Sequence, residues 1–421
     1  MDPKLIAAVI FCVSYTGIVL FKTAKSQILW VGIGAGIVFG LVSSHDIVHD
    51  INWNVMGIFV GTLVLAEFFV LSRIPDAIAV FLVRRSSNVG AAFMYVCIFS
   101  SFLSIFIENV AVVLIVAPIA IGLARKINVS PVPVIIGIAI CSNLQGTATL
   151  IGDPPSMILA NYQRMNFNDF FFYQGKPSIF FAVQAGAIGS LLILYLIFRK
   201  YRRTVDFSGM VMVRSYIPLV LLIAMILGLA MASLVDPGFR WFGGFICVLM
   251  ATVIFFTSAA DWGEKRQILR WFDWATTFFL AGVFVMVGML ERAGLIASFA
   301  NILANGVGNN PAVAFGIIVW GSVAFSAFVD NVPYITAMIP VVQHVSRGMG
   351  LEPELLVFGL LIGACLGGNI TPVGASANVV STGILRKHGH LVSFGEFMKI
   401  GLPFTAAATA LGMAVIYWIW R

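Results

Sequence analysis

Two acidic residues stand inside apolar stretches of the sequence, 222 positions apart. Glu108 lies in the sequence Ile-Glu-Asn-Val and Asp330 lies in Val-Asp-Asn-Val. A charged carboxylate deep in a membrane costs roughly 2.5–3.5 kcal/mol on insertion scales, so such a group usually binds an ion, a proton or a polar partner. We predict that Glu108 and Asp330 bind protons or another coupling cation. The alternative is a carboxyl neutralised by a hydrogen bond to a nearby helix end.

Asparagine follows each acid, as Asn109 and Asn331. An amide side chain offers two donors and an acceptor at the point where the backbone is expected to turn. We predict that both amides contact a solute. The alternative is that each one caps the helix that begins there.

Glycines and prolines interrupt the apolar segment that follows each acid. Unwound backbone at membrane depth is tolerated only where protein or a water-filled cavity satisfies its polar groups. The breaks recur in register, which favours a binding site over a simple packing kink. Asp153 has no acidic counterpart, because Ala375 stands at the matching position, and we expect it to cap the short helix after Pro155, with a third titrating acid as the alternative. The predicted break residues are Gly152, Asp153, Pro154, Pro155, Pro372 and Gly374.

The polar residues and glycines around the acids and breaks are the predicted solute ligands. They are neutral donors and acceptors, and neither hairpin tip nor break contains Lys or Arg, so a small hydroxylated solute or small ion suits them better than a dicarboxylate or phosphate. Cys141 and Cys365 precede the breaks and could bind a soft metalloid, although a small buried apolar role is the favoured interpretation. The predicted ligands are Asn109, Asn143, Gln145, Gly146, Thr147, Thr149, Asn331, Gly368, Asn369, Thr371, Ser376 and Asn378.

The composition indicates a membrane protein. The 421 residues are 60% hydrophobic and 10% charged, whereas soluble domains have roughly 45–50% apolar and about 25% charged residues. The net charge of +7 is spread over the loops, so we expect no nucleic-acid partner. No nucleotide-binding, protease or esterase motif is present, and we predict a protein that is not an enzyme and holds no cofactor or structural metal.

The fold class that we predict is an all-α polytopic membrane protein with about ten transmembrane helices. Two further apolar segments, 89–124 and 310–346, carry the acids and are predicted to be re-entrant hairpins. The segments 74–85 and 295–306 are too short to span and are predicted to be interfacial or connecting helices. The predicted spans are 5–21, 27–44, 54–72, 131–162 (broken), 177–198, 215–233, 240–258, 274–291, 353–385 (broken) and 400–419.

Basic residues orient this arrangement. With the two hairpins, 18 of the 25 Lys and Arg residues fall on one face, which the positive-inside rule makes cytoplasmic. Both termini are then expected outside the cytoplasm, in the inner membrane of a bacterium. Each half has an odd number of crossings, so the second repeat, 215–421, is inverted relative to the first, 1–198, with a basic linker at 199–214. Such inverted repeats with broken helices are a recurring transporter design.

Four motifs resemble those of the arsenite permease and sodium/proton antiporter branch of the ion transporter superfamily. These are Phe106–Val110, Gly146–Pro155, Phe328–Pro333 and Gly367–Gly374. The branch also includes the melanosomal P protein and plant silicon effluxers. The resemblance covers nearly the whole chain and implies two inverted repeats, an elevator-type motion and a dimer. The first acid is usually Asp in similar members, whereas this chain has Glu108.

We therefore expect a secondary active transporter, with proton-coupled efflux of arsenite or antimonite as the leading function. Its partners would be a small neutral metalloid hydroxide or small ion, protons and the lipid bilayer. One alternative is a sodium/proton antiporter that uses the same acids as a cation site. Another is a metalloid permease energised by a separate soluble ATPase.

Overall fold

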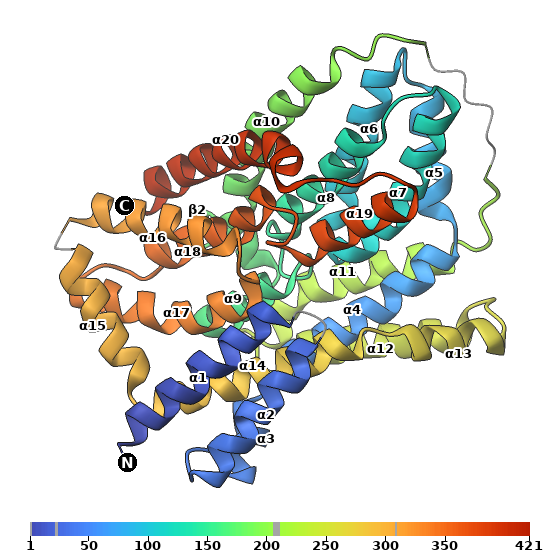
Figure 1. The fold of residues 1–421 in the computed structure, drawn as a ribbon. Helices are drawn as coiled ribbons and strands as arrows, with labels where there is room; N and C mark the ends of the chain where they lie inside the picture. Colours follow the sequence, from blue (N-terminus) through green and yellow to red (C-terminus); the bar gives the residue numbers. More distant parts are fainter. Residues whose placement is uncertain (1, 22–23, 205–210, 308–309) are drawn as a thin grey trace.

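The computed structural model describes residues 2–21, 24–204, 211–307 and 310–421. The described chain is helical apart from one short β-hairpin (Figure 1). The elements of the first half are α1 (Pro3–Leu20), α2 (Lys25–Val38), α3 (Ser44–Asp50), α4 (Trp53–Leu71), α5 (Ile74–Arg84), α6 (Val89–Ser104), α7 (Asn109–Lys126), α8 (Val132–Gly146), α9 (Pro154–Gln163), η2 (Asn168–Phe170), β1 (Phe172–Tyr173), β2 (Lys176–Pro177) and α10 (Ile179–Phe198).

The second half has no β-hairpin in its described residues, and its 3-10 helix lies before, and not after, the helix that follows the break. Its elements are α11 (Ile217–Val235), α12 (Phe242–Thr257), α13 (Trp262–Trp271), α14 (Trp274–Arg292), α15 (Leu295–Val307), α16 (Pro311–Ser326), α17 (Asn331–Gly348), α18 (Glu354–Gly367), η3 (Gly368–Ile370), α19 (Ser376–Lys387) and α20 (Phe394–Trp420).

Six helices of the described residues are long and apolar enough to cross a membrane: α4, α7, α10, α11, α14 and α20. The apolar helices α1, α2, α6, α8, α12, α16 and α18 are shorter. The protein is therefore an all-helical membrane protein, as its composition predicted. The number of crossings, the inverted repeats and the re-entrant nature of the hairpins remain predictions.

Several predicted boundaries need correction. The predicted span 27–44 is too long, because α2 ends at Val38 and the chain turns at Gly40, whose φ is +71°. The last predicted span begins too late, since Ser393 caps α20, which starts at Phe394. The short helices α3 and α13 were not predicted. Each begins with a capping box, made by Ser43 and Asp46 in α3 and by Asp261 and Glu264 in α13.

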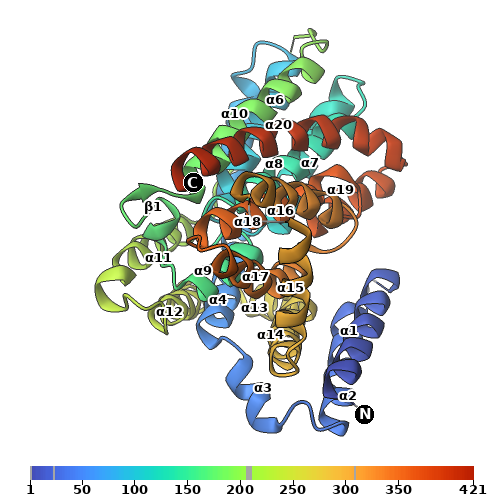
Figure 2. The same ribbon diagram turned by 90° about the vertical axis from the view of Figure 1, so that its left-hand side faces the viewer.

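Helices of the first half pack against helices of the second half. α2 packs against α14, and α12 packs against α4. Figures 1 and 2 show α1 and α2 side by side at the edge of the molecule nearest the N-terminus. Small residues allow this packing: a Cβ added to Gly61 would lie 2.4 Å from the backbone carbon of Cys247, and one added to Gly282 would lie 2.9 Å from a Leu29 methyl.

The helices around the breaks also cross between the halves. α7 contacts α19, and α17 contacts α9, so each hairpin touches the helix that follows the break of the other half. α10 packs along α20 (Figure 1). The breaks of both halves are thereby held in the interior of the protein.

Candidate functional site

The two acids begin the second helix of each hairpin. Glu108 is the N-cap of α7, and its Oε2 accepts hydrogen bonds from the backbone N–H groups of Val110 (2.8 Å) and Ala111 (3.1 Å). Asp330 is the N-cap of α17, and its Oδ1 accepts from the N–H of Val332 (3.2 Å). A helix N-terminus carries partial positive charge, which stabilises a carboxylate there. Helix-end hydrogen bonding, raised above as an alternative for the acids, is therefore present at both.

The asparagines after the acids do not cap these helices, so the capping alternative for them is wrong. Asn109 is the first residue of α7, and its Oδ1 accepts a hydrogen bond from the Ser104 hydroxyl at 2.6 Å. Its amide also lies against Gly146, where an added Cβ would be 2.2 Å from Asn109 Oδ1. Asn331 occupies the matching position in α17. Asn109 thus links the first hairpin to the end of α8.

Each break is tied to the tip of its own hairpin by a threonine. The hydroxyl of Thr149 donates to the carbonyl of Ile105, and that of Thr371 donates to the carbonyl of Ala327. Both threonines are fully buried. The two bonds join corresponding positions of the two halves.

A pair of glycines closes each break. A Cβ added to Gly152 would lie 2.3 Å from the carbonyl oxygen of Gly146. One added to Gly374 would lie 2.6 Å from the carbonyl oxygen of Gly368. Real Cβ atoms do not approach this closely, so both breaks need glycine for backbone-to-backbone contact.

The two breaks meet through amide side chains. Nδ2 of Asn143 donates to Oδ1 of Asn369 at 2.8 Å and to Oδ1 of Asn378 at 2.9 Å. Asn378 in turn donates to the carbonyls of Gly368 and Thr371, both at 2.8 Å. All of these side chains are buried. Within the described residues, Nδ2 of Asn369 has no hydrogen-bond partner.

The remaining predicted residues lie at the ends of the helices that flank the breaks. Asp153 caps α9 by accepting from the N–H of Ser156 at 3.1 Å, as favoured from the sequence, and Pro154 and Pro155 are the first residues of α9. Gln145 exchanges two hydrogen bonds with Gln184 of α10, at 3.0 and 2.9 Å. Thr147 follows α8 and donates to the carbonyl of Asn143 at 3.3 Å. Pro372 lies between η3 and α19, and Ser376 begins α19.

Lys25 is the residue that the sequence analysis missed. Its ammonium lies 3.4 Å from Oδ2 of Asp330, although 305 positions separate the two residues. They border a cavity of about 200 Å³, which Gly374 and Ser376 also line. The prediction that the lining of the site contains no cation is therefore wrong at Asp330. No sequence motif marks Lys25, which simply begins an apolar helix.

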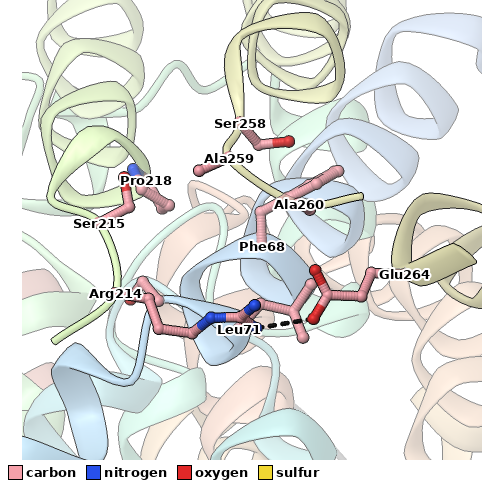
Figure 3. Close-up of a pocket in the computed structure, with 10 residues that line it drawn as sticks. Phe68, Leu71, Arg214, Ser215, Pro218, Ser258, Ala259, Ala260 and Glu264 are labelled. Atoms are coloured by element: carbon pink, nitrogen blue, oxygen red, sulfur yellow. Dashed lines mark hydrogen bonds and ion pairs between the residues drawn. The ribbon is translucent and has the colours of Figure 1, made fainter. Parts of the chain in front are cut away.

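A second pocket lies away from the predicted site. It holds about 70 Å³ between α4, α11 and the segment before α13, and Figure 3 shows Arg214 paired with Glu264 across it. The nitrogen–oxygen distance of that pair is 2.7 Å. None of the predicted acids, ligands or break residues lines it. Elsewhere in the described part of the chain, no group of three or more His, Cys, Asp or Glu side chains is placed to hold a metal ion.

Comparison with known proteins identifies the family. Residues 15–363 match the citrate transporter family. The chain belongs to this family. It is 28% identical to an uncharacterized transporter of Mycobacterium bovis over 99% of this chain and 98% of that protein. It is 27% identical to the human P protein over 89% of this chain and 54% of the relative. The resemblance to the ion transporter superfamily is confirmed. The family and the relatives are transporters, so the chain is a transporter rather than an enzyme.

Two solved structures share the fold of this citrate transporter family member. The YdaH transporter of Alcanivorax borkumensis superposes with a TM-score of 0.59 and 16% identity, over 88% of this chain and 86% of that one. MtrF of Neisseria gonorrhoeae, described with a class of antimetabolite efflux pumps, superposes with a TM-score of 0.56 and 15% identity, over 92% of this chain and 84% of that one. At these identities the likeness concerns the fold.

Proposed function

We propose that this chain is a proton-coupled secondary transporter that exports a small hydroxylated solute, with arsenite or antimonite as the leading substrate. The solute binds where the two breaks meet. Protons enter through Glu108 or Asp330, and an elevator-type movement of the hairpins and broken helices carries the site across the bilayer. The two halves act as inverted repeats, 1–198 and 215–421, with the hairpins re-entrant from opposite faces.

The observation that carries this proposal is the junction of Asn143, Asn369 and Asn378. Three amides from opposite halves share hydrogen bonds, and the buried Asn369 amide keeps an unused donor. An unpaired buried donor costs roughly 1–3 kcal/mol. A hydroxylated solute that accepts from this donor would recover that cost. Neutral amides bind neutral oxygen atoms without requiring a counter-charge.

Transport of a carboxylate such as citrate is the second candidate, favoured by the family and by Lys25. The Lys25 ammonium could bind a carboxylate at the cavity beside Asp330. However, Asp330 already neutralises Lys25, and no other Lys or Arg among the described residues lines that cavity. A neutral solute therefore fits the described residues better.

The test is proton movement in proteoliposomes that hold a pH-sensitive dye. Arsenite, antimonite, silicic acid, citrate and sodium are added in turn. We expect a response to arsenite or antimonite that Glu108→Gln abolishes, whereas Glu396→Gln, a change at an exposed acid of α20, leaves it intact. Full gradient-driven transport in both Glu108→Gln and Asp330→Asn would exclude the proton-coupling mechanism. A response to sodium alone would instead indicate an antiporter, and a response to citrate alone would indicate the carboxylate carrier.

A further inference from the structure

We propose that Lys25 is a built-in cation for Asp330, so that the second acid site is permanently neutralised by the chain and Glu108 alone exchanges protons during transport. The inference rests on the proposed function for the role of Glu108. The occupancy of the Asp330 site by Lys25 is testable without any substrate.

The Lys25 ammonium has two partners on different helices. It lies 3.4 Å from Oδ2 of Asp330 and 4.7 Å from the centre of the Phe279 ring on α14. The Phe279 side chain is fully buried. A carboxylate and an aromatic face together make a site for a monovalent cation. In this chain the cation is a side chain.

The ion pair is itself largely shielded. The exposed fractions of the Lys25 and Asp330 side chains are 18% and 25%. Breaking a shielded pair by removing one partner leaves an uncompensated charge, which is strongly destabilising. The Asp330 carboxylate is therefore expected to keep its ammonium partner or, if Lys25 is removed, to take up another cation.

Glu108 has different surroundings. Among the described residues, the ion pairs join Lys25 to Asp330, Arg214 to Glu264 and Arg292 to Asp50, and Glu108 takes part in none. From the part of the chain that the structure describes, its carboxylate accepts backbone hydrogen bonds at the start of α7. Asp330 is thus paired with the fixed positive charge of Lys25, whereas the carboxylate of Glu108 can take up a mobile proton.

Other titratable groups near Asp330 do not compete for this role. Among the described residues, they are the phenols of Tyr15 on α1 and Tyr334 on α17. Phenols are uncharged at neutral pH. Of the groups that the structure describes, Lys25 is therefore the one that balances the charge of Asp330.

The first experiment measures thermal unfolding of the purified protein in detergent, in sodium chloride or choline chloride of equal ionic strength. Wild type and Lys25→Arg should unfold at the same temperature in both salts. Lys25→Met should be stabilised by several degrees in sodium, saturably, because Asp330 then binds the ion. Lys25→Met/Asp330→Asn should lose that response. Lys176→Met is the matched control, since Lys176 lies 5.0 Å from the centre of the Trp420 ring and forms no ion pair with another described residue.

Two results would overturn the occupancy of the site. One is the absence of any sodium response in folded Lys25→Met. The other is a saturable sodium response of wild type that Asp330→Asn removes. If Lys25→Met does not fold, recovery of folding in the double variant supports the pair, and equal failure of the double variant contradicts it.

The second experiment assigns the proton. In proteoliposomes, Glu108→Gln should reduce proton movement coupled to solute at least tenfold more than Lys25→Met/Asp330→Asn does. Equal loss of coupling in both would overturn the assignment to Glu108. The unfolding assay contains neither solute nor a proton gradient, so an incorrect substrate would leave its result unchanged.

Discussion

Thr149 and Thr371 make the same hydrogen bond in the two halves of the chain. Each donates its hydroxyl to the carbonyl of the residue directly after the first helix of a hairpin, Ile105 or Ala327. The bond joins a hairpin tip to a helix break in each half. We expect each hairpin and its broken helix to form one mechanical unit.

Replacement of either threonine should loosen this unit. Thr149→Val and Thr371→Val keep the shape of the side chain but leave a buried carbonyl without its donor, which should cost about 1–3 kcal/mol of unfolding free energy. Thermal unfolding in detergent measures the loss. Thr252→Val is the control, because the hydroxyl of this exposed threonine donates to the carbonyl of Val248 in its own helix. Unchanged unfolding temperatures in both buried variants would show that the bonds add nothing to stability.

Alanine at the break glycines should prevent normal folding or transport. Gly152→Ala and Gly374→Ala place a methyl group 2.3 and 2.6 Å from carbonyl oxygens, which forces the backbone apart. We expect solute flux to fall at least tenfold in each. Gly122→Ala in α7 and Gly316→Ala in α16 have open space and should leave flux intact, with up to about 1 kcal/mol of added helix stability. Wild-type flux in the break variants would contradict the tight packing.

Asn143→Ala should separate the two breaks. It removes the donor shared by Asn369 and Asn378, and we expect solute flux to fall tenfold or more with a lower unfolding temperature. Asn301→Ala, on the exposed surface of α15, should change neither quantity. Uptake of labelled arsenite into inverted vesicles measures the flux, and equal flux in both variants would place the solute elsewhere.

Asp236, in the turn between α11 and α12, should make stability depend on pH. Burial raises its pKa, but hydrogen bonds from the N–H groups of Trp241, Phe242 and Arg240 outweigh this effect and hold the pKa below its ordinary value of 3.8. A lowered folded-state pKa stabilises the protein above that ordinary value, and the contribution disappears as pH falls through the folded-state pKa. Asp236→Asn should therefore lower the unfolding temperature at pH 7 and make less difference near pH 3. A constant difference across this range would contradict the charge-dependent contribution.

The predicted orientation can be checked by cysteine labelling. In a background without the five native cysteines, single cysteines at positions 2 and 421 should react with an impermeant reagent added to intact cells. A cysteine at position 266, in α13, should react only after the membrane is opened. Reaction of position 266 in intact cells, with protection of both termini, would reverse the orientation.

The amino-acid sequence determined the class of protein and most of its elements. Lipid must solvate so apolar a chain, and the length of each apolar run sets the length of its helix, so α4, α10, α11 and α14 lie close to their predicted spans. The breaks could be placed because glycine and proline act locally, through the backbone that they permit or interrupt. The capping role of Asp153 was predictable for the same reason, as it depends on the N–H of Ser156, three positions away.

The tertiary structure alone decided which distant groups meet. Asn143 meets Asn369 and Asn378 because α8 packs against η3 and α19 of the other half, and nothing near Asn143 in the sequence specifies those partners. Lys25 reaches Asp330 for a related reason: α2 packs on α14, which brings the start of α2 to the tip of the second hairpin. A local pattern cannot specify a contact across 305 positions. The charge balance of the second acid was therefore set by packing between helices, which the sequence pattern did not reveal.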